Sequence, residues 1–139
     1  MYTKDVRQIL NTDAFEYQII AMVNRERAKA GLRPLAPDDR LSKIARLKSG
    51  DMLVHNYCGH ESPVYGGPFD MLADFGINYR RAGENVAKGY GTPEAVMTGW
   101  MESPGHRNNI LGPDYEKIGV GVAKDSFGTV FWTQLFIVD

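Results

Sequence analysis

The sequence contains only one cysteine, Cys58, in 139 residues. A single cysteine cannot form an intramolecular disulfide, so the chain is not a small disulfide-stapled scaffold. No apolar run approaches the length of a signal-peptide core or a membrane span. We therefore expect no transmembrane segment, and either a protein that stays inside the cell or a chain whose leader has been removed.

Neither sign of charge is in excess: 16 Lys and Arg residues face 17 Asp and Glu residues, for a net charge of −1. Binding along a phosphate backbone needs a basic surface, so we expect no nucleic-acid partner. A hydrophobic fraction of 43% and a charged fraction of 24% are typical of a globular chain. The length indicates one domain, which we place at residues 13–139, after an N-terminal extension of residues 1–12.

Helical patterns occupy the first third of the chain and two later segments. Apolar spacing, with flanking proline and glycine, predicts helices over residues 14–30, 38–55, 68–75 and 93–101. Asp13 is the expected N-cap of the first helix, Asp38 or Asp39 of the second and Thr92 of the last. After Pro104 we expect only a brief turn.

Strand patterns occupy the C-terminal quarter, after a centre at residues 56–91 that we interpret largely as glycine-rich loop. Residues 117–123 and 129–138 predict two antiparallel strands joined by a hairpin turn at residues 125–128. Gly119 and Gly121 allow a neighbouring backbone or side chain to approach closely. Helices followed by an antiparallel hairpin indicate an α+β fold built from packed layers.

The side chains best suited to chemistry are two of the three histidines and three glutamates. They are His60 and His106, both in glycine-flanked loops, with Glu61, Glu84 and Glu102. Two imidazoles and one or two carboxylates in one cleft could bind a divalent ion such as zinc, or serve as general acid and base. The competing interpretation is that both histidines only hydrogen-bond loop backbone.

A nucleophile is harder to find in the sequence. Cys58 lies two residues before His60, so a cysteine–histidine pair is one alternative, although a lone cysteine is more often a small buried hydrophobe. Ser62 and Ser103 each precede proline, which is typical of turn and cap residues. The chain has no G-x-S-x-G elbow and no phosphate-binding glycine loop, so we expect no organic cofactor.

Six segments, in this order, resemble the bacterial branch of the CAP superfamily. They are Asp51-Met52, Gly59–Pro63, Ala82–Ala87, Trp100–Leu111, Ile118–Val122 and Trp132–Phe136. This is the SCP-like domain of cysteine-rich secretory proteins, antigen 5 and plant pathogenesis-related proteins. The resemblance covers about residues 14–136, and the motifs are specific as an ordered set.

The resemblance implies a three-layer α–β–α sandwich with a central antiparallel sheet and a cleft lined by two histidines and two acids. His60 and His106 match the histidines, and Glu84 matches the glutamate of the Gly-Glu-Asn motif. Glu102 lies near the place of the second acid, although its spacing after a tryptophan is shorter than in the family, and Glu61 is the alternative. The resemblance also implies zinc or another divalent cation, held by His60 and His106.

The family further implies a protein that is extracellular or attached to the cell envelope or spore, while a cytoplasmic location stays open. The chain lacks the disulfides and the cysteine-rich extension of animal and plant members. We expect a binding module for a small ligand or a cell-envelope component. The alternative is a hydrolase of peptide or cell-wall material, in which His60 and His106 hold a metal or act as acid and base, and Glu84 polarises water.

Overall fold

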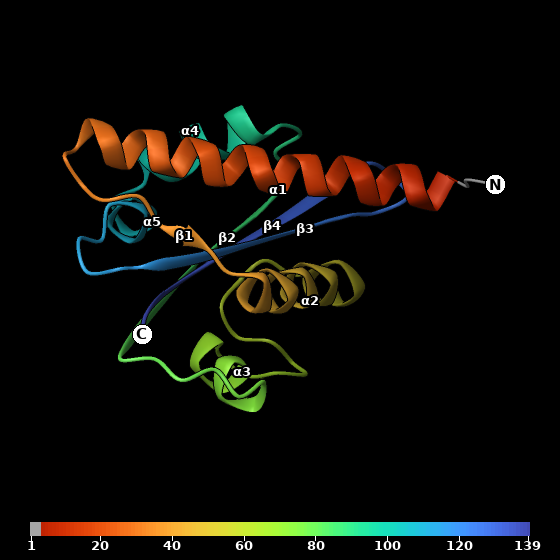
Figure 1. Cartoon of the computed structure of the whole chain (residues 1–139). Coiled ribbons are helices and arrows are strands. Elements are labelled where there is room, and N and C mark those ends of the chain that lie inside the picture. The colour runs from red at the N-terminus through yellow and green to blue at the C-terminus, as the bar shows by residue number, and fades with distance from the viewer. Residues whose placement is uncertain (1–3) are drawn as a thin grey trace.

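The protein folds into three layers, with helices on both faces of one sheet (Figure 1). The computed structural model describes the backbone of residues 4–139 and the side chains from Ala14 onward. One face carries α1 (Lys4–Lys29), α4 (Pro93–Glu102) and α5 (Pro104–Ile110), and the other carries α2 (Asp39–His55) and α3 (Pro68–Asp74). The α+β sandwich expected from the sequence is confirmed.

The sheet has four strands in the order β1-β3-β4-β2. They are β1 (Ala36–Pro37), β2 (Arg81–Lys88), β3 (Lys117–Lys124) and β4 (Val130–Val138). β3 and β4 are antiparallel, as predicted, and β2 adds a third long strand antiparallel to β4. The two-residue β1 pairs with β3 in parallel, so the whole sheet is mixed rather than purely antiparallel.

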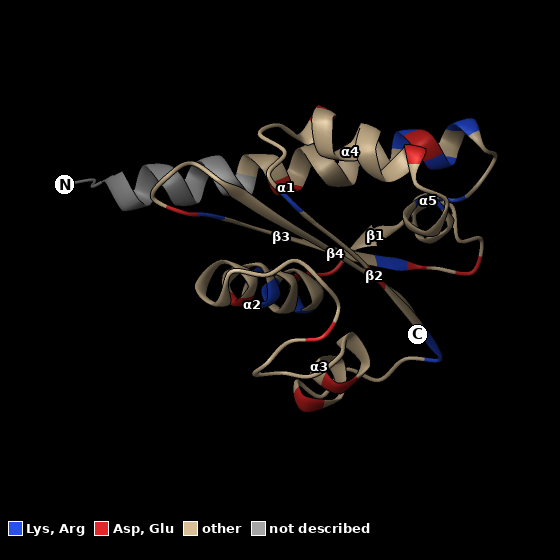
Figure 2. Cartoon of the chain, turned by 180° about the vertical axis from the view of Figure 1, so that it is seen from behind, with Lys and Arg blue, Asp and Glu red and all other residues tan. Residues whose placement is uncertain are grey.

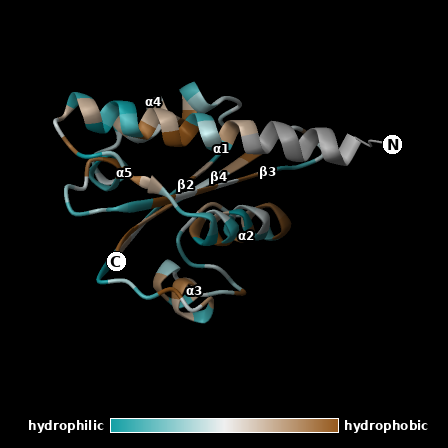
Figure 3. Cartoon of the chain, in the orientation of Figure 1, coloured by the Kyte–Doolittle hydropathy of each residue, from teal (hydrophilic) through white to brown (hydrophobic). Residues whose placement is uncertain are grey.

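β4 is a central strand, and all nine of its residues are buried. Trp132 and Phe136 pack in the cluster formed with α1, α4 and α5, whereas Leu135 and Ile137 pack with residues of α2 and α3. This alternation follows from the two-residue period of a strand. A strand covered on both faces is hydrophobic throughout, which explains the nearly continuous apolar sequence of β4 (Figure 3).

The close approach predicted at Gly119 and Gly121 is confirmed, and the neighbour is the backbone of α2. A Cβ at Gly119 would overlap the backbone of Leu41, and one at Gly121 would overlap the backbone of Ala45 and Arg46. α2 therefore lies directly on β3, with no side-chain layer between the two backbones at these positions.

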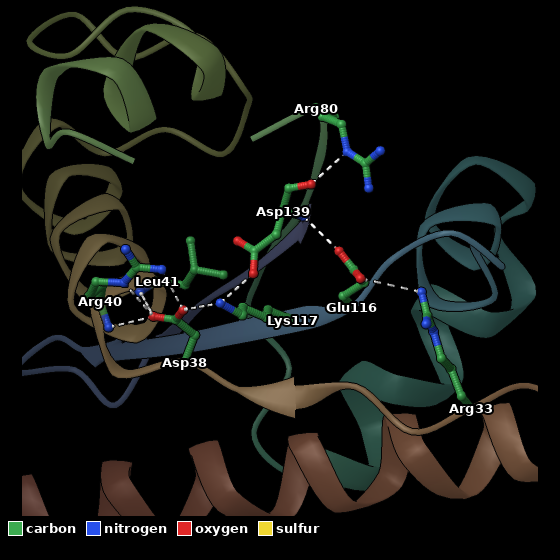
Figure 4. Close-up of polar contacts among 8 residues, drawn as sticks. All are labelled: Arg33, Asp38, Arg40, Leu41, Arg80, Glu116, Lys117 and Asp139. Carbon is green, nitrogen blue, oxygen red and sulfur yellow. Dashed lines mark hydrogen bonds and ion pairs between the residues drawn. The ribbon is translucent and has the colours of Figure 1, made fainter. Parts of the chain in front are cut away.

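Polar side chains fix the start of α2 against the sheet (Figure 4). Asp38 is the N-cap of α2 and accepts hydrogen bonds from the backbone nitrogens of Arg40 and Leu41. Lys117 of β3 places its Nζ 4.0 Å from Asp38 Oδ2 and 2.6 Å from Asp139 Oδ2. These contacts join the first turn of α2 to the strand beneath it.

The predicted start of the first helix is wrong. α1 begins at Lys4, well before Ala14, so Asp13 lies inside the helix and is not its N-cap. Residues 4–13 contain no glycine or proline that would end a helix. Residues 1–3 and the side chains of residues 1–13 lie outside the described part, so the domain boundary after residue 12 stays a prediction.

Two elements lie where the sequence predicts loop or turn. β2 occupies part of the glycine-rich centre, although Ala, Gly, Glu and Asn give it little β propensity. Its strand conformation comes from eight residue pairs with β4. The segment after Pro104 is the helix α5 rather than a brief turn. Within the described residues, no helix is both long and apolar enough to cross a membrane.

Candidate functional site

The candidate site lies at β2, an edge strand of the sheet whose successive residues serve opposite helical layers. Glu84 pairs with Leu135 of β4, and Asn85 pairs with Gln134. Directly paired residues share a face, so Glu84 points toward α2 and α3 and Asn85 toward α4 and α5. Side chains from both layers can therefore meet at this strand.

His60 and Glu84 form a direct pair. His60 Nδ1 lies 2.8 Å from Glu84 Oε1; the Glu84 side chain is 2% exposed and that of His60 56% exposed. The hydrogen bond that His60 donates to Glu84 raises the pKa of His60, and partial burial of the ring opposes this. A buried carboxylate therefore orients a half-exposed imidazole, an arrangement common around metal-binding histidines.

A buried polar cluster on α2 holds the loop that carries His60. Lys48 is 1% exposed, and its Nζ donates to the His60 carbonyl oxygen at 3.0 Å and to Tyr57 Oη at 3.3 Å. The hydroxyls of Tyr57 and Ser62 both donate to Asp51 Oδ2. Burial lowers the pKa of Lys48, although the nearby charge of Glu84 opposes the shift.

Sequence reasoning assigned no function to Lys48 or Asp51. Both lie within the segment of α2 whose pattern indicates an apolar packing face. Their charge could have indicated a role in the site, because a charged side chain on the buried face of a helix needs a polar partner. The partners come from the loop, which the helical pattern does not include.

His106 reaches the site from α5. Its Nδ1 lies 2.9 Å from Ser103 Oγ, and its carbonyl oxygen accepts a hydrogen bond from Asn85 Nδ2 at 3.0 Å. Asn109 of α5 donates to the Glu84 carbonyl oxygen at 3.1 Å. Burial lowers the pKa of His106, and the charge of His60 adds to the shift. Glu84 is thus joined to His60 through its side chain and to α5, the helix of His106, through its backbone carbonyl oxygen.

The two histidines present the same atom to a ligand. Both Nδ1 atoms are engaged, by Glu84 and by Ser103, and in the described part of the chain neither Nε2 atom has a hydrogen-bond partner. Because Glu84 accepts from Nδ1 of neutral His60, Nε2 of His60 carries a lone pair, and Nε2 of His106 does so in the tautomer that donates to Ser103. Among the described residues, no three His, Cys, Asp or Glu side chains are placed to hold a metal ion together.

The two candidates for the second acid lie in different grooves. Glu102 is exposed at the end of α4 and lines a groove beside α1, together with Met22 and Glu26. Glu61 lines the same groove as His60 and Glu84. The structure therefore places Glu61, rather than Glu102, beside the His60–Glu84 pair.

Neither Cys58 nor Ser62 is activated as a nucleophile, whereas Ser103 Oγ lies 2.9 Å from the His106 ring. Cys58 is exposed, so its interpretation as a buried hydrophobe is wrong, and partial burial of its thiol raises its pKa. Ser62 is the turn residue the sequence indicated: its Oγ accepts from the backbone nitrogens of Val64 and Tyr65. Ser103 is the N-cap residue of α5, but its side chain contacts the His106 ring instead of the helix backbone.

Comparison with known proteins identifies the family of the chain. Residues 20–136 match the cysteine-rich secretory protein family, CAP. The chain is 52% identical over 127 residues to the uncharacterized protein YkwD of Bacillus subtilis, covering 91% of this chain and 48% of that protein. A crystal structure of an extracellular SCP-domain protein from Bacillus anthracis superposes with a TM-score of 0.89 at 32% identity, over 100% of this chain and 44% of that one.

The fold is also found in a protein of more distant sequence. An outer surface protein of Borrelia burgdorferi superposes with a TM-score of 0.79 at 22% identity, over 99% of this chain and 96% of that one. The chain spans about half of the two Bacillus proteins. It belongs to the cysteine-rich secretory protein (CAP) family and shares its SCP domain with bacterial relatives.

Proposed function

We propose that the chain is a binding module whose cleft, formed by His60, Glu84 and His106, holds a divalent cation such as zinc or a small ligand. The observation that carries the proposal is that both Nδ1 atoms are engaged, while neither Nε2 atom has a hydrogen-bond partner among the described residues. Zinc takes neutral imidazole nitrogens readily, and a carboxylate behind the ring fixes the tautomer and strengthens the ligand. Bound zinc would supply Lewis acidity at the cleft.

Binding is favoured over hydrolysis because neither Cys58 nor Ser62 is activated as a nucleophile. The Cys58 thiol has a raised pKa. The Ser62 hydroxyl donates to Asp51 and accepts a hydrogen bond from the backbone of its own turn. A hydrolase would need a base-activated hydroxyl or thiol, or a tightly held metal with an open position. Two imidazole ligands suit a weakly held, exchangeable cation better.

We place this module outside the cytoplasm, at the cell surface or in the medium. The Bacillus anthracis relative, which covers the whole of this chain at 32% identity, is described as extracellular. A cell-envelope component or a small molecule of the medium is the expected partner. Cell fractionation of the source bacterium with an antibody to this domain tests the location, and recovery in the cytosol alone would contradict it.

Zinc titration by calorimetry tests the metal site. We expect saturable binding to the wild type, a loss of at least about tenfold in affinity in Glu84→Gln, and no measurable binding in the double variant His60→Ala, His106→Ala. His55→Ala is the matched control, because His55 pairs with Asp51 away from the Glu84 carboxylate and should leave zinc binding intact. Unchanged heats in the double variant would sink the proposal.

A further inference from the structure

A groove of about 430 Å³ opens beside the His60–Glu84 pair, between α3 and β2. Its ionisable lining consists of His60 and three carboxylates, which belong to Glu61, Asp70 and Glu84. Glu61 Oε1 and Asp70 Oδ2 converge over Gly67, since a Cβ there would lie 2.9 Å from the first and 3.7 Å from the second. The groove thus gathers acids from a loop, a helix and a strand.

Acidic residues outnumber basic residues around the groove. From Ser49 to Tyr79 the chain has no Lys or Arg but four acids, and α3 with its preceding loop shows only acidic colour in Figure 2. His60 and Lys48 interact with the charges of Glu61 and Glu84, and Lys48 is buried. The lining of the groove itself holds three carboxylates and, apart from His60, no basic side chain.

The hydrogen bonding of the Glu84 carboxylate also favours a ligand in the groove, independently of the net charge. Its side chain is 2% exposed and lines the groove, and one oxygen, Oε1, is engaged by His60. The other oxygen, Oε2, has no hydrogen-bond partner among the described residues. The Glu84 side chain is thus mostly buried, but Oε2 is not an enclosed atom, so a hydrogen-bond donor from a ligand in the groove can reach this oxygen.

An aromatic platform forms the outer wall of the groove. Phe69 lines the groove, is 54% exposed and stacks on Tyr79, with ring centroids 6.1 Å apart. A ring face offers no ligand to a bare metal ion, but it attracts an organic cation.

We propose that this groove binds a primary ammonium group carried on an aliphatic chain, such as the amine of a lysine-like side chain, with the ammonium against Glu61, Asp70 and Glu84 and the aliphatic part against Phe69. The same chemistry is present in peptide side chains and in free diamines. The inference rests on the proposed function for the location of the site, but the amine contacts use groove residues rather than the Nε2 atoms that would hold zinc.

The test is an NMR titration of the ¹⁵N-labelled chain, with EDTA present, using Nα-acetyl-lysine N-methylamide as the probe. Its Nε-acetylated form is the neutral control of almost the same shape. We expect the amine, and not the neutral form, to shift the amide signals of Gly67 and Gly83 saturably. Glu61→Gln should weaken this binding about five- to tenfold and Phe69→Ala about two- to fivefold.

Matched variants separate the groove from general electrostatics. Asp74→Asn and Phe75→Ala remove an acid and an aromatic ring of the same segment that lie outside the groove, and should leave amine binding unchanged. His106→Ala should keep amine binding while reducing zinc binding, so the two proposals fail separately. Equal shifts with the neutral probe, shifts with N-acetylglucosamine but not the amine, no saturable shift, or an equal loss in Asp74→Asn would each overturn the inference.

Discussion

At the scale of single residues, the two site histidines have opposite electrostatic surroundings. The carboxylate of Glu84 raises the pKa of His60, whereas burial lowers the pKa of His106 and the charge of His60 lowers it further. His60 therefore keeps its proton to a higher pH than an ordinary imidazole, and His106 loses its proton at a lower pH. As pH falls, His60 gains its proton first and His106 second, and each protonation removes a nitrogen lone pair that a metal needs.

NMR titration of the metal-free protein checks this order. We expect His60 to titrate above about 6.5 and His106 below it. Glu84→Gln should lower the pKa of His60, because the anionic acceptor is gone. Since folding raises the pKa of His60, its contribution to stability is present below about pH 6.5 and is lost as pH rises through the folded-state value. Identical pKa values in wild type and Glu84→Gln would contradict the assignment.

At the scale of elements, the packing of α2 on β3 decides where the site loop begins. The helix backbone lies on Gly119 and Gly121, and the same helix carries Lys48 and Asp51, which hold the loop of His60. A shift of α2 away from the sheet would therefore move the loop as well. Close packing at two glycines thus supports the position of a functional side chain.

Gly121→Ala tests this packing. The new methyl group would overlap the backbone of α2, which cannot rotate away as a side chain could, so we expect the free energy of unfolding to fall by about 1–3 kcal/mol or more. Gly50→Ala is the matched control: its Cβ would meet nothing within 4 Å, and alanine should stabilise α2 by about 0.5–1 kcal/mol. Urea unfolding measures both, and equal stability of the two variants would disprove the close contact.

At the scale of the whole molecule, Arg27 joins the first helix to the last one before the hairpin. It is completely buried in α1 and donates to the carbonyl oxygens of Ile110 and Gly112, at 3.0 and 2.7 Å, and to that of Arg33 at 2.9 Å. The bonds to Ile110 and Gly112 fix the C-terminal end of α5, the helix that carries His106. The N-terminal third of the chain thereby positions one side of the site.

Arg27→Met should remove these donors and leave buried carbonyl oxygens without partners. We expect a loss of about 2–5 kcal/mol in the free energy of unfolding. Arg25→Met, an exposed position on the same helix, is the control and should change stability by less than about 0.5 kcal/mol. The midpoints of denaturant unfolding, at a constant m value, compare the stability of the two variants. Similar losses of stability in both would show that the buried contacts of Arg27 do not stabilise the fold.

Much of the architecture could be predicted from local signals. The limits of α2 follow from its cap Asp38, and β3 and β4 follow from alternation and β-branched content. α1 starts earlier than predicted. It begins at Lys4, and the capping pattern at Asp13 does not interrupt it. β2 could not be predicted, because its eight residues have weak strand propensity and become a strand only through pairing with β4.

The sequence by itself determined the fold class and identified candidate site residues, because residue type and hydrophobic period are local properties. Its single cysteine and lack of long apolar runs also excluded disulfide-stapled and membrane-spanning scaffolds before any fold was known. Only the tertiary structure decided which side chains meet. The edge position of β2 places Glu84 against His60 and brings Glu61, rather than Glu102, into their groove, since such meetings depend on distant segments packing around one strand.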